Sequence, residues 1–204
     1  MPTRTADALL FDLGRVVIDI DFKRAVACWA GHARCDPREI EERFRHDVSH
    51  RRHEVGEIDM AEYFAGLKAA CDFDMSYEQF VEGWNAIFVG EMPGMAELLE
   101  RAARELPLYA FTNTNPDHEA VWSRRFADIL ANFQEIFVSS TIRLRKPDPA
   151  AYDHVVKAIG VPAQRIVFFD DGIENVEGAR ARGLQAVHVR SSADVAHALD
   201  ALGL

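Results

Sequence analysis

The stretch IVFFDDGIENVEGA, residues 166–179, decides the fold. It opens with four apolar residues, continues with an acid pair and a glycine, and ends in a helical pattern that Gly183 is placed to stop. The apolar run does not alternate strictly, which is typical of a strand covered on both faces of a parallel sheet. Four further runs of this kind occupy residues 8–11, 108–111, 136–138 and 186–189.

Helical patterns alternate with these runs from residue 93 onward. One begins at Pro149, which suits the first turn of a helix and follows Asp148. Another occupies residues 173–182. Alternation of strands and helices predicts an α/β fold with a doubly wound, parallel, Rossmann-like sheet.

The residues between the first and second runs have helical rather than strand character. Three capping-box patterns begin at Asp36, Asp59 and Ser76, each followed three residues later by Glu or Gln. Apolar stripes containing Trp29 and Trp84 follow helical spacing, and we expect these tryptophans to form the core of this part. The sequence thus predicts an α/β core of residues 1–15 and 92–204, with about four helices at 16–91 inserted as a cap over its ligand-binding edge.

Composition limits the class of protein. The chain has 204 residues, 49% hydrophobic and 27% charged, which is globular. Its 23 Lys and Arg residues against 33 Asp and Glu residues give a net charge of −10, which disfavours nucleic acid as a partner. Three cysteines without metal-ligand spacing favour a reducing, cytoplasmic setting, and the apolar run near the N-terminus is too short for a signal peptide or membrane span. We therefore expect a small-molecule partner and no membrane.

Polar side chains end several of the predicted strands. Because the carboxyl ends of parallel strands meet at one edge of the sheet, where ligands bind, these side chains are expected to lie together. An aspartate after a strand is by itself more often a turn or cap residue, but the set points to one site. Its members are Asp12, Thr112, Asn113, Lys146, Asp170 and Asp171.

This set suits phosphoryl transfer. Three aspartates can hold Mg²⁺, which prefers carboxylate oxygens, water and phosphate, and Lys146 adds a second positive charge for the phosphate. The Thr112 hydroxyl and the Asn113 amide or backbone N–H can hold phosphate oxygens. Asp12 would then form an aspartyl-phosphate that water hydrolyses. The alternative is a plain buried ion cluster, in which the acids would repel one another and raise each other's pKa.

The order of these motifs resembles the haloacid dehalogenase superfamily of phosphatases. FDLGRVV at 11–17 is similar to its nucleophile loop, FTNT at 111–114 to its phosphate loop, RKPDPAAY at 145–152 to its lysine motif and FFDDGIEN at 168–175 to its metal motif. The helical insert after the nucleophile loop resembles that family's cap. Further details, such as FDLGRVVIDIDF and VFFDDGIENVEGA, look closest to the α-D-glucose-1-phosphate phosphatase branch.

The resemblance implies a role for each matched residue. Asp12 is the expected nucleophile and a Mg²⁺ ligand, Gly14 offers the metal its backbone carbonyl, and Asp171 offers a carboxylate. Asp170 is expected to contact the metal directly or through water, and Asn175 to support the loop. By the same resemblance, Thr112, Asn113 and Lys146 bind the transferring phosphate.

One position departs from the family pattern. The usual second aspartate of the nucleophile loop, a general acid and base, is replaced by Gly14. A glycine can offer a carbonyl to the metal but cannot donate a proton, so a slow enzyme or a substituted donor is expected. Asp19 and Asp21 are candidate substitutes, although their position favours a place at the start of the cap.

Three rival functions remain to be weighed. A 2-haloacid dehalogenase also lacks the second aspartate, but the acid pair Asp170–Asp171 favours a metal-dependent phosphatase. A receiver domain uses similar residues, but its acid pair comes first in the chain, so the motif order excludes it. A non-catalytic phosphate- or sugar-binding protein that keeps the metal site is supported by Gly14 alone.

The predicted cap carries a histidine stripe. His46, His50 and His53 share one helical face, a spacing that can bind zinc, but interleaved arginines would repel a cation. Contacts to a substrate from His50, Arg52 and His53 are the favoured interpretation. His118, near the start of the helix after FTNTN, is a candidate contact to the leaving group, the alternative being a surface residue at a helix N-terminus.

Overall fold

The structure is a computed structural model that describes residues 5–44, 48–71 and 74–204. Its centre is a parallel five-stranded sheet in the order β5-β4-β1-β6-β7. The strands are β1 (Ala8–Phe11), β4 (Leu108–Thr112), β5 (Glu135–Val138), β6 (Ile166–Asp170) and β7 (Gln185–His188). All five predicted strands are confirmed, and so is the doubly wound, Rossmann-like class. The strand order reverses beside β1, so the ends of β1, β4 and β6 share the edge where ligands bind in such sheets.

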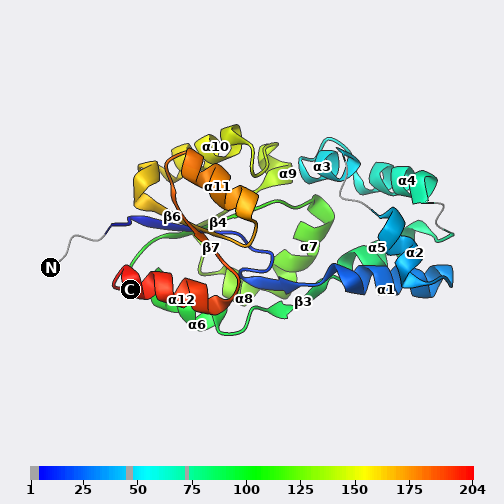
Figure 1. Ribbon diagram of the computed structural model, residues 1–204, viewed down its shortest axis with the longest axis horizontal. Coiled ribbons are helices and arrows are strands. Elements are labelled where there is room, and N and C mark those ends of the chain that lie inside the picture. The colour runs from blue at the N-terminus through cyan, green and yellow to red at the C-terminus, as the bar shows by residue number, and fades with distance from the viewer. Residues whose placement is uncertain (1–4, 45–47, 72–73) are drawn as a thin grey trace.

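Helices cover both faces of the sheet (Figure 1). Successive strand residues point to opposite faces, so Ala8 and Leu10 pack with one group of buried side chains and Leu9 and Phe11 with another. The first face is covered by α10 (Pro149–Ile159) and α11 (Ile173–Ala181). The second is covered by α6 (Met95–Ala103), α7 (Pro116–Arg125), α8 (Ala127–Leu130) and α12 (Ser192–Ala201). Two short elements, α9 (Ser139–Ile142) and η1 (Ala163–Arg165), complete the core.

The predicted insert forms a helical lobe beyond one edge of the sheet (Figure 1). Its helices are α1 (Phe22–Ala33), α2 (Pro37–Arg43), α3 (Val48–Glu54), α4 (Met60–Cys71) and α5 (Tyr77–Asn85). The capping boxes at Asp36 and Ser76 start α2 and α5 as expected, and Asp59 and Glu62 exchange the same bonds before α4. The described part of the lobe thus holds five helices rather than about four. The fifth, α3, is polar and has no apolar stripe that would predict it.

Two strands in this region correct the expectation of an all-helical insert. β2 (Ile18–Ile20) pairs antiparallel with β3 (Phe88–Glu91), and Ile18 lies opposite Glu91. This ribbon joins the helical lobe to the core (Figure 1). The segments are too short to show a strand period, and each exists because of a partner about seventy residues away, so local pattern could not reveal them.

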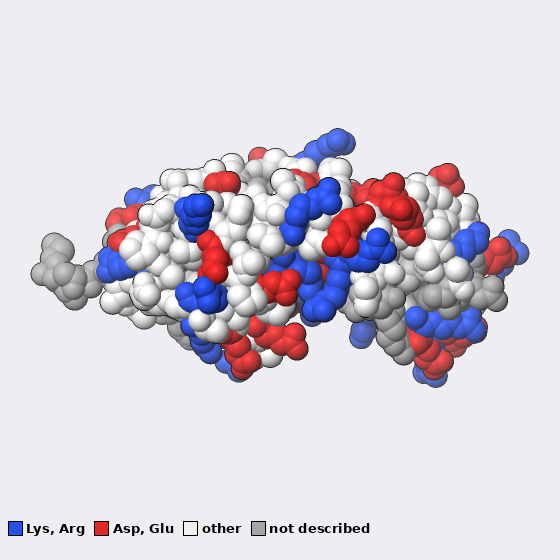
Figure 2. Space-filling model, turned by 90° about the horizontal axis from the view of Figure 1, so that it is seen from above, with Lys and Arg blue, Asp and Glu red and all other residues white. Residues whose placement is uncertain are grey.

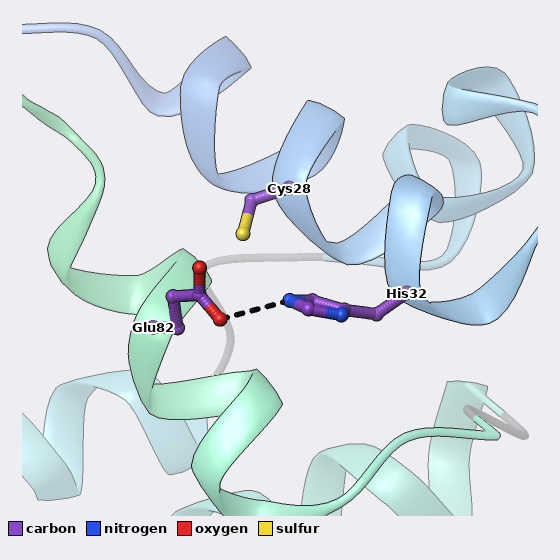
Figure 3. Close-up of side chains that lie close together, drawn as sticks. All are labelled: Cys28, His32 and Glu82. Atoms are coloured by element: carbon purple, nitrogen blue, oxygen red, sulfur yellow. Dashed lines mark hydrogen bonds and ion pairs between the residues drawn. The ribbon is translucent and has the colours of Figure 1, made fainter.

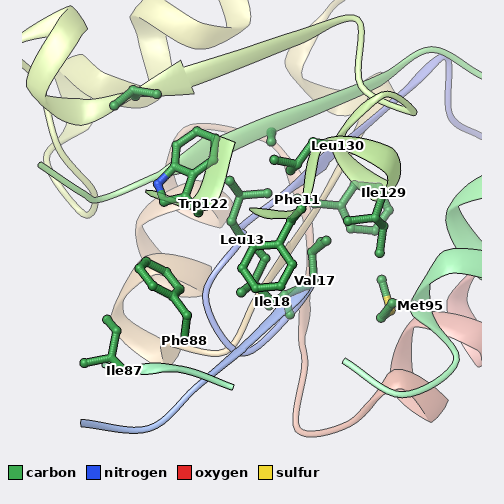
Figure 4. Packing of buried hydrophobic residues seen from close by; sticks show 14 of the residues in the cluster. Phe11, Leu13, Val17, Ile18, Ile87, Phe88, Met95, Trp122, Ile129 and Leu130 are labelled. Atoms are coloured by element: carbon green, nitrogen blue, oxygen red, sulfur yellow. The ribbon is translucent and has the colours of Figure 1, made fainter. Parts of the chain in front are cut away.

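One apolar cluster runs from the core into the helical lobe. It includes Phe11 of β1 and Met95 of α6 as well as Trp29 and Trp84 of the lobe, all fully buried. Figure 4 shows the junction, where Phe11, Leu13 and Trp122 lie near Phe88 of the ribbon. Continuous packing fixes the lobe against the sheet edge. In the part of the chain that the structure describes, no helix is long and apolar enough to cross a membrane.

Candidate active site

Three charged side chains meet beneath the end of the sheet. The Lys146 ammonium lies 2.9 Å from Asp12 Oδ1 and 2.7 Å from Asp170 Oδ2, and it also donates to the Phe111 carbonyl at 2.7 Å. Asp12 follows β1, and Asp170 ends β6, so parallel pairing of these strands brings the two carboxylates to the same level. Lys146 is only 1% exposed and Asp170 is fully buried. The sheet therefore places a lysine between two buried acids.

Burial shifts the protonation of this cluster. The pKa of Asp12 is raised to about 7, chiefly by burial; the Lys146 charge lowers it, while the nearby Asp170 and Asp171 carboxylates raise it. Burial alone would lower the pKa of Lys146, but Asp12 and Asp170 hold it above its ordinary value. Lys146 is therefore the permanent positive charge of the site, and any further cation near Asp12 would favour its carboxylate form.

Asp170 and Asp171 play different parts. Asp170 Oδ1 accepts from the Gly172 amide at 2.8 Å and from Asn175 Nδ2 at 2.9 Å, while its Oδ2 meets Lys146. Both oxygens of Asp170 are thus engaged, one of them by the Asn175 side chain. Asp171 is partly exposed, and Arg15 lies 3.9 Å from its Oδ2. Burial raises the pKa of Asp171, with help from Asp170.

The donors here fit a hard divalent cation. Carboxylate oxygens of Asp12, Asp170 and Asp171 all lie within 4.8 Å of one another, a cluster that the magnesium prediction requires. Asp12, Asp171 and Gly14 line the open cavity, whereas Asp170 is not among the described lining residues. Asp12 and Asp171 therefore face the cavity, whereas Asp170 contacts Lys146 and the loop that begins at Gly172.

The predicted phosphate-binding residues lie beside this cluster. Thr112, at the end of β4, is 5% exposed and lines the cavity together with Asn113 and Lys146. The Asn113 side chain is already used, because Oδ1 accepts from the Lys146 amide and Nδ2 donates to the Lys146 carbonyl, both at 2.9 Å. This pair fixes the lysine loop against the end of β4. Of the two groups expected from Asn113, the side-chain amide is therefore already engaged within the protein.

The departure at Gly14 has a structural counterpart. A Cβ at Gly14 would lie 3.0 Å from Ile20 Cδ1, so a second aspartate here would require the Ile20 side chain to shift. Asp21, one suggested substitute, caps α1 by accepting from the Lys23 amide at 2.9 Å. Asp19, the other, lines a second hollow and is not among the described residues of the main cavity. Neither aspartate is placed to replace the missing acid.

A cavity of about 400 Å³ lies between the sheet edge and the helical lobe. Figure 2 shows charged side chains of both signs gathered where the molecule narrows between these two parts. The core contributes the residues described above, and the lobe contributes His50, Arg51 and Glu54 from α3. Residues of both the core and the lobe thus line one cavity.

Glu54 and Arg145 join the two walls of this cavity. Arg145 Nε and Nη2 lie 3.0 and 2.9 Å from Glu54 Oε2, and the Glu54 backbone carbonyl accepts from Ser139 Oγ at 2.6 Å. Glu54 is 8% exposed, and burial raises its pKa more than the charges of Arg145 and Lys146 lower it. A buried carboxyl group with a raised pKa thus faces the same cavity as Asp12.

His118 also joins core and lobe, and it is buried rather than a surface residue. Its Nε2 lies 2.9 Å from the Trp84 carbonyl, to which it donates, and Nδ1 lies 3.3 Å from Asn115 Nδ2. The ring stacks on Trp84 with centroids 4.7 Å apart. Burial lowers the pKa of His118 to about 4, so the ring is neutral. It lines the cavity, but a substrate bond to either nitrogen would displace one of these partners.

The structure places the residues of the predicted histidine stripe in different surroundings. His50 lines the cavity with its Nδ1 3.7 Å from Glu54 Oε2. His53 is fully buried and stacks on Tyr63, and the exposed Arg52 pairs with Glu57 at 3.2 Å. Neither His53 nor Arg52 is among the described lining residues, so the expected substrate contacts from these two are wrong. His46 lies outside the described residues.

Sequence reasoning missed Glu54 and Arg145. Glu54 sits in a polar run with no spacing of its own, and Arg145 precedes Lys146 in a motif interpreted through the lysine. The bond between them links residues 91 positions apart. Only the adjacency of Arg145 to a phosphate-binding lysine could have marked it as a candidate.

Comparison with known proteins places the chain in a family. The haloacid dehalogenase-like hydrolase family matches residues 6–183. The chain belongs to this family. The fold of these haloacid dehalogenase-like hydrolases is also seen in a family enzyme from Bacteroides thetaiotaomicron, whose crystal structure holds magnesium and inorganic phosphate. The two share 24% identity and a TM-score of 0.78, over 91% of this chain and 95% of the other.

Two curated relatives show different extents of similarity. The D-ribitol-5-phosphate phosphatase of Bacteroides thetaiotaomicron is 20% identical over 191 residues, 91% of this chain and 93% of the relative. The drimenol cyclase drtB of Aspergillus calidoustus is 36% identical over 91 residues, 44% of this chain but only 17% of the relative. The chain thus spans a small part of some of its relatives and nearly all of others.

Proposed function

We propose that this chain is a Mg²⁺-dependent phosphatase of small phosphate monoesters that works through an aspartyl-phosphate on Asp12. The observation that carries the proposal is Asp12 itself, a cavity-lining carboxyl group 2.9 Å from the Lys146 ammonium and clustered with Asp170 and Asp171. An anionic nucleophile can approach an anionic phosphate only where positive charge offsets the repulsion. Relatives named as phosphatases support the same chemistry.

Each group of the site has a part in this reaction. Asp12 attacks phosphorus, and Lys146 stabilises the negative charge of the phosphate. The Thr112 hydroxyl and the Asn113 backbone N–H hold phosphate oxygens. Asp12, Asp171 and the Gly14 carbonyl would hold Mg²⁺, with Asp170 behind them. The bound ion would supply charge neutralisation between carboxylate and phosphate.

A small sugar or polyol phosphate is the substrate class that we propose. The lobe side of the cavity is lined by polar groups of His50, Arg51 and Glu54, which suit hydroxyl-rich molecules. The sequence resemblance to α-D-glucose-1-phosphate phosphatases and the relative named for D-ribitol 5-phosphate support this class. We propose glucose 1-phosphate as the first compound to test, and we expect a cytoplasmic protein from its cysteine content.

The experiment is a screen of phosphorylated metabolites with and without Mg²⁺, including glucose 1-phosphate and ribitol 5-phosphate. Phosphate release that requires Mg²⁺ and stops with a chelator is expected. Chelator-insensitive release would contradict the metal-dependent mechanism. Binding of beryllofluoride without turnover of any compound would favour the non-catalytic binding protein instead.

A 2-haloacid dehalogenase is the second candidate, favoured by one observation. Gly14 and Ile20 leave no second acid in the nucleophile loop, a feature that dehalogenases share. The acid cluster around Asp12 argues against it, because dehalogenation needs no metal. Chloride release from chloroacetate, independent of Mg²⁺, would support this candidate and is not expected.

A further inference from the structure

The cavity lacks an acid where the family pattern places one, yet it holds another from the lobe. Among the described lining residues, the carboxyl groups besides Asp12 and Asp171 are Glu54 and Glu174. Glu174 is exposed at the start of α11, whereas Glu54 is 8% exposed. His118 is neutral and has both ring nitrogens engaged. Glu54 is therefore the buried, titratable proton carrier of this cavity.

The contacts around Glu54 engage its carboxylate oxygen Oε2 and leave Oε1 for a ligand. Both nitrogens of Arg145 reach Oε2, and His50 Nδ1 lies 3.7 Å from the same oxygen. As far as the described residues go, Oε1 has no recorded hydrogen bond. Arg145 also directly precedes Lys146, whose ammonium touches Asp12. One short segment thus positions Glu54 and the nucleophile on opposite sides of the same cavity.

We propose that Glu54 is the general acid and base of this site, in place of the aspartate whose position Gly14 occupies; this role rests on the phosphatase function proposed above. In the first step an Asp12 oxygen bonds to phosphorus and the bond from phosphorus to the ester oxygen breaks. Glu54 gives its proton to that oxygen, so a neutral alcohol leaves. In the second step Glu54 takes a proton from water, the water oxygen bonds to phosphorus, and the bond to Asp12 breaks, releasing phosphate.

The charged groups that face Glu54 affect its pKa, and with it the pH range in which it can donate a proton. Arg145 and Lys146 approach from the core, and His50 and Arg51 lie on α3 itself. Arg145, Lys146 and Arg51 lower the pKa of Glu54, but burial outweighs them and raises it. A carboxyl group with a raised pKa keeps a protonated fraction nearer neutral pH, which an acid catalyst needs.

The test compares two leaving groups in the Glu54→Gln variant. A sugar or alkyl phosphate needs a proton on its leaving oxygen, whereas p-nitrophenolate leaves as a stable anion. We expect kcat/KM for the sugar phosphate to fall on the order of 10²–10⁴-fold and that for p-nitrophenyl phosphate to fall far less. The alkaline limb of the pH profile should disappear for the sugar phosphate. Because water activation is also lost, phosphoenzyme should accumulate with both substrates.

Matched variants separate catalysis from positioning. Glu57→Gln changes an exposed glutamate of the same region, paired with Arg52, and should leave both rates unchanged. Arg145→Gln removes the groups that hold Glu54 Oε2, so it should lower kcat/KM for the sugar phosphate more than that for p-nitrophenyl phosphate. An equal loss with both substrates in Glu54→Gln, or leaving-group selectivity in His50→Asn instead, would overturn the role of Glu54 while phosphatase function stands. A wild-type protein that hydrolyses neither substrate overturns both proposals.

A second, independent site lies on the outer surface of the lobe. Cys28 and His32 are one turn apart on α1, and Glu82 faces them from α5 (Figure 3). His32 Nε2 lies 3.0 Å from Glu82 Oε2, and the ligand atoms of all three residues lie within 4.8 Å of one another. Ligands around a tetrahedral zinc ion lie about 3–4 Å apart, so small rotamer changes suffice to surround an ion.

The two helices that carry these residues are held rigidly. Trp29 Nε1 donates to the Phe80 carbonyl at 2.9 Å, and the two rings stack with centroids 5.0 Å apart. Gly83 permits this approach, because a Cβ there would lie 2.2 Å from Trp29 Nε1. This contact therefore fixes the spacing of the two helices from which the three donor side chains project.

We infer that Cys28, His32 and Glu82 bind a divalent transition-metal cation such as Zn²⁺, with water in the fourth position. Thiolate and imidazole ligands favour Zn²⁺ over Mg²⁺, so this site is chemically distinct from the carboxylate cluster around Asp12. The cation would link α1 to α5 and stabilise the lobe. The thiol proton of Cys28 is released to solvent on binding.

Cobalt is the probe, because a thiolate–cobalt bond gives a near-ultraviolet charge-transfer band that oxygen ligands do not. The full chain in excess Mg²⁺ should develop this band with one equivalent of Co²⁺, and Zn²⁺ should remove it. Cys28→Ser should abolish the band, while Cys35→Ser, a half-buried cysteine outside the cluster, should retain it. Absence of the band in the wild-type chain, or its persistence in Cys28→Ser, would overturn the site.

Discussion

The two walls of the cavity are stabilised by opposite means. The core wall buries charge, with Lys146 between Asp12 and Asp170, whereas the lobe buries aromatic rings, with Trp29 stacked on Phe80. Burying ions costs free energy that their mutual attraction only partly returns, while burying rings stabilises the fold directly. We therefore expect the buried charges of the core to serve the chemistry and the buried rings of the lobe to stabilise the fold. Variants on the two sides should separate activity from stability.

The largest expected effect is on the core side. Asp12→Asn should lower phosphatase turnover at least on the order of 10⁴-fold, because it removes the nucleophile. Its free energy of unfolding should stay close to that of the wild-type chain, because Lys146 keeps its contact with Asp170. Steady-state kinetics and urea unfolding of the same preparations measure both. A variant that is inactive because it is unfolded would contradict the expected separation of activity in the core from stability in the lobe.

The reverse pattern is expected on the lobe side. Trp29→Ala should lower the free energy of unfolding by about 3–5 kcal/mol, because it empties a fully buried position. Trp29 is not among the described cavity residues, so turnover per folded molecule should change little. Trp29→Phe, which keeps a stacked ring but loses the bond to Phe80, should cost less. Equal losses in the two variants would show that the hydrogen bond, not ring burial, matters.

A pH effect of intermediate size is expected where the walls meet. The pKa of His118 is lowered to about 4 in the folded chain, below its ordinary value of 6.5. The unfolded chain therefore takes up a proton first as the pH falls, so stability is complete above pH 6.5 and is lost towards pH 4, by about 3 kcal/mol. Urea unfolding of His118→Gln should show a weaker pH dependence in this window. His154→Gln, an exposed control, should behave like the wild-type chain.

The smallest expected effect concerns the ribbon between the walls. Gly14→Asp should destabilise the chain by about 2 kcal/mol, because its Cβ would meet Ile20 at 3.0 Å. In a double-mutant cycle, Ile20→Ala should relieve this cost, which would show as a favourable coupling energy. Gly90→Asp, with open space around its Cβ, serves as the control. Additive costs at positions 14 and 20 would contradict the steric account.

The local sequence predicted much of the core but less of the lobe. Each strand of the parallel sheet is a compact apolar run, so Asp12, Thr112 and Asp170 could be assigned to strand ends before any coordinates. The capping box formed by Ser76 and Gln79 likewise marks the start of α5. The ribbon of Ile18–Ile20 and Phe88–Glu91 could not be found in this way, since its only signal is the pairing itself.

The sequence alone therefore determined the fold class and the set of polar groups at the sheet edge. The signals for both are apolar runs and capping boxes, and each of these is formed by residues close together in the chain. Only the tertiary structure decided which of these groups face a ligand. Asn113 gives its side chain to Lys146, His118 gives its ring to Trp84, and Glu54 reaches the cavity through Arg145. These contacts join residues 33, 34 and 91 positions apart, and such distances leave no periodic trace in a sequence.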